Sequence, residues 1–575
     1  EYYRPTSQDN AACFYYPPVA QLPNLIELPG PCDTSITGLA NFDYLGTWIE
    51  EARYPQTPQT GQCNRATYGT GTTTGVFTVE NRQVTNEALL TISGQATATS
   101  QPGVLAVTFN IGGVPTTQNI YVLATDYDSY ALLYTCTNIE GNRRQVGSWK
   151  LRRNIDVPLS TEATNNINAV ITRTQGLREE YYRTTGQDNA ACFYYPPVEQ
   201  LPGVITLPGP CNTSITGVCP KFNRNPYLGT WLEVAKYPQR TQTGQCARAT
   251  YGQGATAGVV TVLNSQVLNE ELFTELGEAR PTEQSGVLQV TFVINNQPVV
   301  QNLYVLATDY DNYALLYSCT NIAGNQRQVG SWKLRRSLVE LSETANNAIN
   351  SVISATQGLR EEYYQDTPQT ANACFYYPQK TGNEEKVLIP GQCDAAISGV
   401  ANFNFADSAW YQIRRYDAVG DRSCIGKRMT RNGDTYFDVD FVEVIGQEVR
   451  RVEAIARLDT TKTGKFVVSF GNSENAEFYI LATDYDSYAI AYNCSNEGAN
   501  QRHVGAWLLS RTRTWPAAGT TALNTLIAAR QEITNRPGYF KDVTQNEDCP
   551  EPSSAFLFRS SIIMIFVCTV LQLVW

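Results

Sequence analysis

Short runs of alternating hydrophobic and polar residues recur along the chain and predict β-strands. In the first third, turn residues separate one run from the next. Such a series favours an antiparallel sandwich or barrel. The runs are Thr47–Tyr54, Asn64–Tyr68, Val76–Glu80, Ala88–Gly94, Val104–Asn110, Asn119–Ala124, Tyr130–Thr135 and Arg144–Leu151.

One amphipathic helix is predicted after these strands. Ser or Thr can cap its start, Gly can end it, and apolar residues at helical spacing share one face. The helix is expected at Leu159–Leu177, with Ser160 or Thr161 as cap, Gly176 at its end and Ile167, Val170 and Ile171 on the apolar face. Its counterparts lie at Leu341–Leu359 and, more weakly, near Thr520–Thr534.

A β-hairpin sequence occurs three times, at Tyr121–Cys136, Tyr304–Cys319 and Tyr479–Cys494. The copies lie about 180 residues apart, a period typical of tandem domains rather than of solenoid repeats. Residues 1–18 also copy 180–197, so we expect the start of the chain to be the closing end of a further domain. The predicted parts are that end at 1–19, domains at 20–197, 198–378 and 379–553, and a hydrophobic tail at 554–575.

The 15 cysteines also follow the repeat, with four classes of position in each domain, so two bridges per domain are expected. Their connectivity stays open on spacing alone. Cys13 belongs to the fourth class, and Cys219 and Cys568 are left over. Disulfides at this density indicate an oxidising compartment.

Charge and histidine content exclude several functions. The net charge of −11 argues against nucleic acid or an anionic membrane surface as partner. His503 is the single histidine, so the first two domains cannot bind a metal through imidazole or use histidine in acid–base catalysis. We therefore predict no metal site and no enzyme. An enzyme would need a reactive thiol, for which Cys219 is the only candidate within a domain.

Three motifs in fixed order resemble those of the lipocalins. They are Gly-x-Trp in the first strand, Thr-Asp-Tyr in the repeated turn, and an arginine four residues after the tryptophan of the last strand. The closest resemblance is to insect bilin-binding and apolipoprotein D-like members. Three domains with a C-terminal tail are similar to the polycalins of insect midgut, which resemble chlorophyllide-binding proteins.

The resemblance implies three eight-stranded up-and-down barrels, all-β, each with one helix packed outside. The motif residues would then be structural, with each arginine stacked on its tryptophan at the closed end. They are Gly46, Trp48, Asp126, Arg153, Gly229, Trp231, Asp309, Arg336, Trp410, Asp484 and Arg511. The implied disulfides are Cys32–Cys136, Cys63–Cys192, Cys211–Cys319, Cys246–Cys374, Cys393–Cys494 and Cys424–Cys549.

A barrel of this size has room for one small ligand. The residues matched to family pockets are Tyr68, Asn81, Phe109 and Trp149, then Tyr251, Asn264, Phe292 and Trp332, then Phe470 and Trp507. Each could instead be packed in the core. Domain three has Met429 in place of the tyrosine, Ser408 in place of the motif glycine, and a basic stretch at Arg414–Arg431, so its ligand differs or is absent.

The predicted function is binding of one small hydrophobic ligand per barrel. No cofactor is required, and the expected ligand is a tetrapyrrole, chlorophyllide or bilin. Fatty acid, retinoid and sterol remain alternatives. A structural or interaction array is the other alternative, and it predicts interiors filled by side chains, with cavities below roughly 300 Å³. Protein partners are unknown.

The C-terminal tail predicts attachment to the cell surface. Ile562–Trp575 is apolar but shorter than the roughly 20 residues that span a bilayer, so replacement by a GPI anchor at Ser553 is expected. A tail anchor that includes Phe556–Phe558 is the alternative. Asn212 begins an N-glycosylation sequon. The protein is therefore expected to be extracellular, with its membrane contact made through the anchor.

Overall fold

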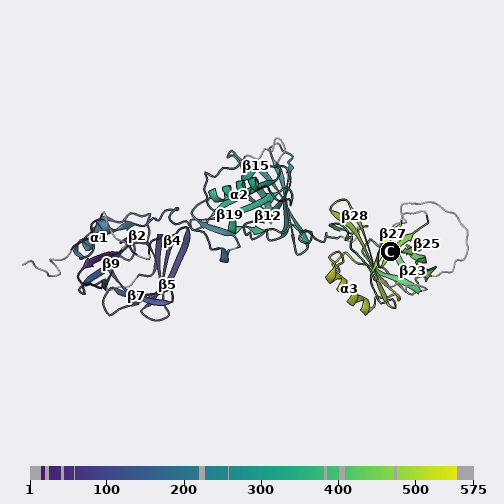
Figure 1. The fold of residues 1–575 in the computed structure, drawn as a ribbon, viewed down its shortest axis with the longest axis horizontal. Helices are drawn as coiled ribbons and strands as arrows, with labels where there is room; N and C mark the ends of the chain where they lie inside the picture. The colour runs from purple at the N-terminus through teal and green to yellow at the C-terminus, as the bar shows by residue number, and fades with distance from the viewer. Residues whose placement is uncertain are drawn as a thin grey trace, which may run out of the picture. The chain divides into compact units, whose positions relative to one another are not determined.

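Three antiparallel sheets make up the described part of the computed structural model (Figure 1). The structure describes residues 15–19, 25–39, 44–56, 59–201, 203–218, 227–256, 258–294, 296–380, 385–400, 408–471 and 475–552. Cys13, Cys219, Cys568, the anchor residue Ser553 and the tail at 554–575 lie outside these ranges. The domain boundaries and the missing preceding domain stay predictions.

Each sheet closes on itself into a barrel of eight strands. In barrel 1, strands β2 to β9 pair in sequence order, and β9 also pairs with β2. Its strands are β2 Gly46–Arg53, β3 Gln62–Thr70, β4 Val76–Thr85, β5 Ala88–Ala98, β6 Val104–Ile111, β7 Val114–Thr125, β8 Tyr130–Ile139 and β9 Arg143–Arg152. The predicted up-and-down barrel is confirmed.

Barrels 2 and 3 repeat this order, with closing pairs β19–β12 and β29–β22. Barrel 2 has β12 Gly229–Lys236, β13 Gln245–Gln253, β14 Val260–Leu268, β15 Glu271–Pro281, β16 Val287–Ile294, β17 Gln297–Thr308, β18 Tyr313–Ile322 and β19 Gln326–Arg335. Barrel 3 has β22 Ser408–Arg415, β23 Arg422–Arg431, β24 Tyr436–Ile445, β25 Glu448–Leu458, β26 Lys465–Ser469, β27 Ala476–Thr483, β28 Tyr488–Glu497 and β29 Gln501–Ser510.

Two short strands flank each barrel and were not predicted. One pairs with the last barrel strand and the other with the first. They are β1 Ile26–Pro29 and β10 Arg183–Thr184, β11 Ile205–Pro208 and β20 Gln365–Asp366, and β21 Leu388–Pro390 and β30 Lys541–Asp542. The Pro-rich, apolar sequence of Pro17–Pro31 is typical of an inter-domain linker, but it contains β1, in which Ile26 and Leu28 are fully buried.

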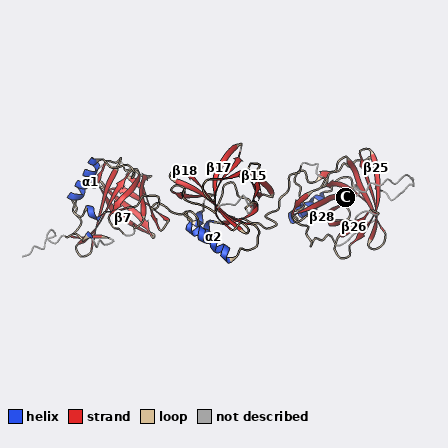
Figure 2. Ribbon diagram, turned by 90° about the horizontal axis from the view of Figure 1, so that it is seen from above, coloured by secondary structure: helices blue, strands red, loops and turns tan. Residues whose placement is uncertain are grey.

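One helix packs against each barrel from outside, as Figure 2 shows for α1 and α2. The helices are α1 Thr161–Arg173, α2 Glu343–Ala355 and α3 Ala517–Ala529, with short 3₁₀ turns η2 Glu179–Tyr181, η3 Val198–Gln200 and η5 Glu361–Tyr363. Ser160 caps α1 by accepting a hydrogen bond from the Ala163 amide at 3.0 Å. The third helix begins at Ala517, earlier than predicted, because no Ser or Thr marks its start.

The tryptophan of each first strand is buried at the closed end of its barrel beneath an arginine. The guanidinium carbons of Arg153, Arg336 and Arg511 lie 3.7, 3.8 and 3.8 Å from the ring centroids of Trp48, Trp231 and Trp410. A cation–π contact that is partly desolvated contributes roughly 1–2 kcal/mol.

The residue two before each tryptophan differs between the barrels. Gly46 has φ +92° and Gly229 has φ +94°, a region that favours glycine, whereas barrel 3 has Ser408 at this position.

The repeated turn and the disulfides complete the shell. Asp126 accepts hydrogen bonds from the amides of Ser129 and Tyr130 at 2.8 and 3.0 Å, and Asp309 and Asp484 repeat the contact. Six disulfides join the pairs that the resemblance implied, Cys32–Cys136, Cys63–Cys192, Cys211–Cys319, Cys246–Cys374, Cys393–Cys494 and Cys424–Cys549.

Candidate ligand-binding cavity

Barrel 1 encloses a cavity of about 270 Å³. Its lower wall is apolar and aromatic, and includes Val107, Leu133 and Leu151. Side-chain amides line the part nearer the open end, where the loop between β2 and β3 lies. These amides are Gln56, Gln59, Asn64, Asn81, Gln83, Gln118 and Gln145, which we call the amide girdle. The cavity is amphiphilic, with an apolar lower wall and a polar mouth that Glu50, Arg65 and Arg82 also border.

The four residues predicted for this barrel all lie in the cavity wall. Asn81, Phe109 and Trp149 are half-buried, so part of each side chain borders the open space. Tyr68 is buried, and burial raises the pKa of its phenol to about 12. Tyr68 therefore faces the cavity as a neutral group at neutral pH. The role of these residues in binding a ligand stays a prediction.

Barrel 2 keeps the same residues with similar exposure. Asn264, Phe292 and Trp332 are half-buried like their counterparts, and Tyr251 is buried with its pKa raised to about 12 by burial. Gly277 lies opposite Phe292, just as Gly94 lies opposite Phe109. The predicted pocket residues of barrel 2 thus occupy the same positions as those that line the cavity of barrel 1.

Barrel 3 is packed with side chains. Phe470 and Trp507, which were predicted to line a pocket, are 6% and 4% exposed and belong to a hydrophobic core of aromatic residues. The space bordered by Trp410, Lys427 and Phe441 is about 10 Å³, room for at most about one water molecule at the usual ~10–15 Å³ and far too small for a ligand. The expectation of one ligand in every barrel stays a prediction for barrel 3, whose described core is packed with side chains.

Larger side chains fill the third barrel at defined positions. The pair Asn81–Ala66 in barrel 1 becomes Phe441–Lys427 in barrel 3. The pair Leu105–Ile120 becomes Phe466–Phe478. Burial lowers the pKa of the Lys427 ammonium well below its ordinary value. Each change adds volume on the inner face, where strand alternation directs every second side chain.

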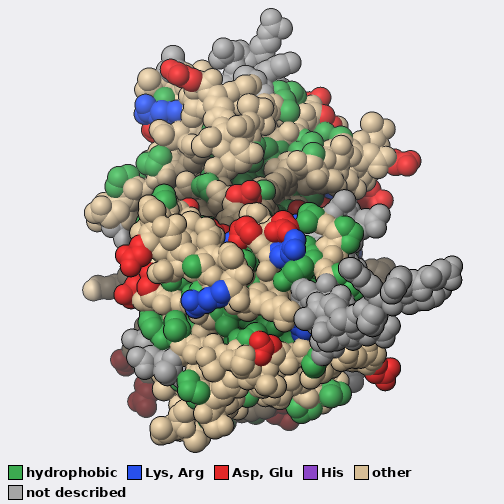
Figure 3. All heavy atoms as spheres, turned by 90° about the vertical axis from the view of Figure 1, so that its left-hand side faces the viewer, with side chains coloured by type: hydrophobic (Ala, Val, Ile, Leu, Met, Phe, Trp, Pro, Cys, Tyr) green, Lys and Arg blue, Asp and Glu red, His purple; other side chains and the backbone are tan. Residues whose placement is uncertain are grey.

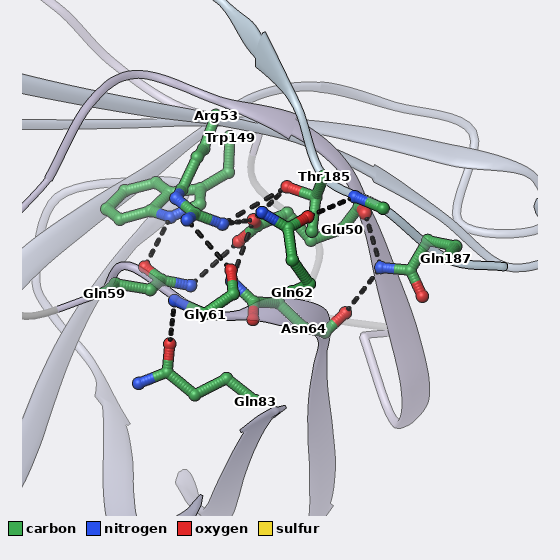
Figure 4. A network of polar contacts seen from close by, with 11 residues as sticks. Glu50, Arg53, Gln59, Gly61, Gln62, Asn64, Gln83, Trp149, Thr185 and Gln187 are labelled. Carbon is green, nitrogen blue, oxygen red and sulfur yellow. Dashed lines mark hydrogen bonds and ion pairs between the residues drawn. The ribbon is translucent and has the colours of Figure 1, made fainter. Parts of the chain in front are cut away.

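A buried ion pair holds the loop at the open end of barrel 1 (Figure 4). Arg53 Nη1 lies 2.5 Å from Glu50 Oε1, and both side chains are almost completely buried. Glu50 also accepts hydrogen bonds from Asn64 Nδ2, Gln59 Nε2 and Thr185 Oγ1, at 2.9, 2.8 and 2.5 Å. The carboxylate is thus fully satisfied, as a buried charge requires.

Gln59 connects this network to the cavity. Its Oε1 accepts a hydrogen bond from Trp149 Nε1 at 3.0 Å, while its Nε2 donates to Glu50 (Figure 4). The same connection recurs in barrel 2, where Trp332 Nε1 donates to Gln242 Oε1 at 3.0 Å and Lys236 pairs with Glu233 at 2.6 Å. The indole at the cavity wall is therefore fixed by the loop in both barrels.

Barrel 3 has a different ion pair at the corresponding place. Gln412 occupies the position of Glu50, and Arg415 pairs with Asp417 at 3.4 Å instead. Asp417 also lies 3.2 Å from His503 Nε2. The unique histidine therefore belongs to a charged cluster with Asp417 and Arg415. Within the described ranges, no three His, Cys, Asp or Glu residues are grouped so that they could hold a metal ion.

The outer surface carries no single dominant charge on the face drawn in Figure 3. Acidic side chains are scattered there among neutral polar and hydrophobic ones, and the visible Lys and Arg side chains lie apart from one another. In the described part of the chain, every helix is too short or too polar to cross a bilayer.

Comparison with known proteins identifies the family. Residues 45–185, 228–371 and 423–518 match the lipocalin / cytosolic fatty-acid binding protein family, one match in each barrel and together more than half of the chain. The chain belongs to this family. The predicted resemblance is confirmed by it.

Individual relatives match one barrel at a time. Apolipoprotein D from Macaca fascicularis is 34% identical over 138 residues, 23% of this chain and 70% of its own length. Lazarillo protein from Schistocerca americana is 31% identical over 27% of this chain and 72% of its own length. Insecticyanin-A from Manduca sexta is 30% identical over 24% of this chain and 78% of its own length. Several other apolipoprotein D sequences are matched over only 58–59% of their length.

Among solved structures, insecticyanin from the tobacco hornworm is 25% identical, with 30% of this chain and 93% of that chain covered and a TM-score of 0.27. Lobster apocrustacyanin A1 is 22% identical, with 26% and 81% covered and a TM-score of 0.23.

Two parts of the site were not predicted from the sequence. The Glu50–Arg53 network depends on Thr185, which is distant in sequence and reaches β2 only because β10 pairs with it. The amide girdle was visible as recurrent glutamines on alternate strand positions. Those glutamines could be assigned to a mouth only after the strand register was known.

Proposed function

We propose that this lipocalin is an extracellular binding protein in which barrels 1 and 2 each take up one small hydrophobic ligand. The cavity in barrel 1 carries this proposal: its volume of about 270 Å³ lies just under the limit of roughly 300 Å³ expected for a structural array, but half-buried aromatic residues face open space there instead of filling it. Barrel 2 keeps the same inner residues. Barrel 3 is proposed to be a supporting domain that binds no ligand of this size.

A flat pigment of the bilin or chlorophyllide class is our first candidate. Phe109 and Trp149 offer flat apolar surfaces, and the neutral amides can bond the edges of a conjugated ring system. The likeness to insecticyanin-A supports this class. A cavity of this size lies just below the usual range of about 300–1,000 Å³, so part of a tetrapyrrole would project through the mouth.

The volume favours a second candidate, a smaller lipid such as a retinoid, sterol or fatty acid. Such a molecule can be enclosed more completely in about 270 Å³. The apolar floor suits its body equally well. The two candidates differ in how much of the ligand stays outside the barrel and in what its polar group contacts.

Attachment to the cell surface is also part of the proposal. The six disulfides support an oxidising compartment, and the chain continues past Pro552 into the apolar tail seen in the sequence. Glu551 is held to barrel 3 by Arg513 at 2.6 Å. The anchor at Ser553 would be detected by release of the protein with a GPI-specific phospholipase. The glycan at Asn212 would be detected by mass spectrometry.

The decisive experiment is to purify the full chain from its source under native conditions and to identify what co-purifies. We expect about two equivalents of ligand per chain, one in each of barrels 1 and 2. A bound pigment would be visible in the absorption spectrum, and a colourless lipid by mass spectrometry. If nothing co-purifies and no candidate quenches the fluorescence of Trp149 and Trp332, the proposed function is wrong.

A further inference from the structure

The inward-facing apolar surface of barrel 1 continues past the enclosed cavity on one side of the mouth. On β6, strand alternation places Val107, Phe109 and Ile111 on the same inner face. All three border the cavity, but Val107 is buried, Phe109 is half-buried and Ile111 is 47% exposed. This apolar column therefore begins inside the barrel and ends in the open.

The strands on either side of β6 end in the same way. Leu90, near the start of β5, borders the cavity and is 47% exposed. Val114, at the start of β7, is paired with Ile111 and is 64% exposed. We call Leu90, Ile111 and Val114 the apolar lip. Exposed apolar side chains grouped beside polar ones are typical of a surface that contacts a ligand or a partner.

The opposite side of the mouth is polar. In the closed barrel, β6 is four strands away from β2 in both directions. The described residues of the loop between β2 and β3 include Gln56 and Gln59, which border the cavity. Gln59 is held there by its hydrogen bonds to Trp149 and Glu50. A molecule that projects from the cavity therefore meets amides on one side and apolar side chains on the other.

The apolar lip is kept in barrel 2 and altered in barrel 3. Barrel 2 has Phe273 and Ile294 at two of the three positions, where they are 47% and 39% exposed. In barrel 3 the position of Leu90 is taken by Arg450, which pairs with Glu443 at 3.7 Å. The lip is thus apolar in the two barrels whose pocket residues are half-buried, and charged where the interior is filled.

We infer that the apolar lip is a second part of the binding site and takes the apolar end of a ligand too long for the enclosed cavity. The lip is continuous with the cavity wall, so one extended molecule can contact both. The enclosed volume of about 270 Å³ lies below the usual ~300–1,000 Å³ of a ligand pocket. The ligand is then an elongated molecule whose projecting end is apolar. This assignment rests on the proposed function and narrows its ligand class.

Straight-chain fatty acids of about 10 to 20 carbons test the assignment on the full chain, because they share one polar group and differ only in apolar length. A methylene that becomes fully buried raises affinity roughly fourfold. A methylene on the lip keeps one side in water, so about twofold is expected for it. Quenching of tryptophan fluorescence should therefore show an affinity that rises steeply for the short acids, then about twofold per methylene, without a plateau.

The lip variant replaces the apolar side chains in both barrels by threonine, which keeps the strand propensity. It combines Leu90→Thr, Ile111→Thr, Phe273→Thr and Ile294→Thr. The shortest acids should bind to it as they bind to the native chain, because the enclosed part is unchanged. Once that part is filled, its affinity should rise less than about 1.3-fold per methylene.

The matched control changes exposed apolar residues on the outer face of the same strands. It combines Leu276→Thr on β15 with Val293→Thr on β16, residues that are 67% and 63% exposed and that alternate with inward-facing ones. Barrel 1 already has Ser93 and Asn110 at these positions, so it needs no change. The control should follow the native chain at every chain length.

Three results would overturn the inference while the proposed function stands. One is a native affinity that reaches a plateau at the same chain length as in the lip variant. Another is a lip variant that loses the same factor at every length, because the four side chains would then belong to the cavity alone. The third is self-association of the unliganded native chain, seen by sedimentation and lost in the lip variant, because a second copy would then cover the lip.

A ligand that co-purifies with the chain provides a separate test if no fatty acid binds. The affinity of a co-purified pigment should be at least about fivefold lower in the lip variant than in the control, and equal affinities would overturn the inference. If no fatty acid binds and nothing co-purifies, the proposed function fails and the assignment of the lip fails with it.

Discussion

Glu50 in barrel 1 is the residue whose substitution should most clearly destabilise the open end of the barrel relative to the rest of it. The substitution Glu50→Gln keeps the size of the side chain and removes its charge. Arg53, 8% exposed, then lies buried without a carboxylate. Removing one partner of a buried pair costs roughly 3–5 kcal/mol. Arg53 keeps its bonds to Gly61 and Thr185, so we expect a smaller loss, about 2–4 kcal/mol.

Hydrogen exchange measured by mass spectrometry is the appropriate assay, because the three barrels need not unfold in one transition. A loss of about 2–4 kcal/mol corresponds to roughly 30- to 1,000-fold faster exchange in β2 and β3 of barrel 1. Peptides from β12 and β13 of barrel 2, with Glu233 and Lys236 intact, serve as the reference within the same molecule.

The double variant Glu50→Gln, Arg53→Gln tests the cause. With both charges removed, we expect a loss of about half that of Glu50→Gln or less, because no unpaired charge remains buried. If Glu50→Gln accelerates exchange less than about fivefold, or if the double variant is as unstable as the single one, the ion pair does not hold the loop as argued.

Three further changes test other parts of the structure. Asn81→Phe, which copies barrel 3, should remove one equivalent of bound ligand per chain, as should Asn264→Phe, and ligand titration that still finds two equivalents would contradict this. Asp126→Asn should destabilise barrel 1 by about 1 kcal/mol at neutral pH. Burial raises the pKa of the Asp126 carboxyl, but hydrogen bonds from Ser129 and Tyr130 bring this pKa below its ordinary value of 3.8. The stabilisation by Asp126 is therefore present above about pH 4 and is lost as the pH falls through the pKa of the folded state. Denaturant titrations of both proteins from pH 7 to 2 should therefore converge, and a constant difference would refute the role of the charge. Phe466→Ala in barrel 3 should lower the free energy of unfolding of that barrel by roughly 3–5 kcal/mol, whereas Phe109→Ala beside the cavity should lower that of barrel 1 by less than about 2 kcal/mol. Equal losses of stability, measured by hydrogen exchange, would show that the two interiors are packed alike.

The barrel shell could be predicted because its determinants are local and repeated. The alternation of the eight runs, the Asp126 turn and the cap at Ser160 each involve residues close in sequence. The disulfides and the Trp48–Arg153 stack are long-range contacts, but the family resemblance supplied them. The short strands β1 and β10 were missed because strands of four and two residues carry little pattern of their own.

The interiors were harder to predict because they depend on several small differences at once. Alternation indicates which side chains face inward, but not whether they meet in the middle. In barrel 3, Phe441, Phe466 and Phe478 belong to one hydrophobic core with Trp410. The sequence analysis named none of these three phenylalanines, because their grouping depends on the strand register.

The three interiors also show why such a change is compatible with one shell. The closed end depends on the tryptophan, its arginine and the repeated turn, and these are present in barrel 3 with Arg511 3.8 Å from Trp410. The cavity lies beyond these contacts, so residues there can change without loss of the fold. Filling it adds buried apolar area, which stabilises a barrel at about 25 cal/mol per Å². A hollow barrel lacks that stabilisation. Because a bound ligand stabilises the state that binds it, barrel 1 is expected to gain more stability from a ligand than barrel 3 could.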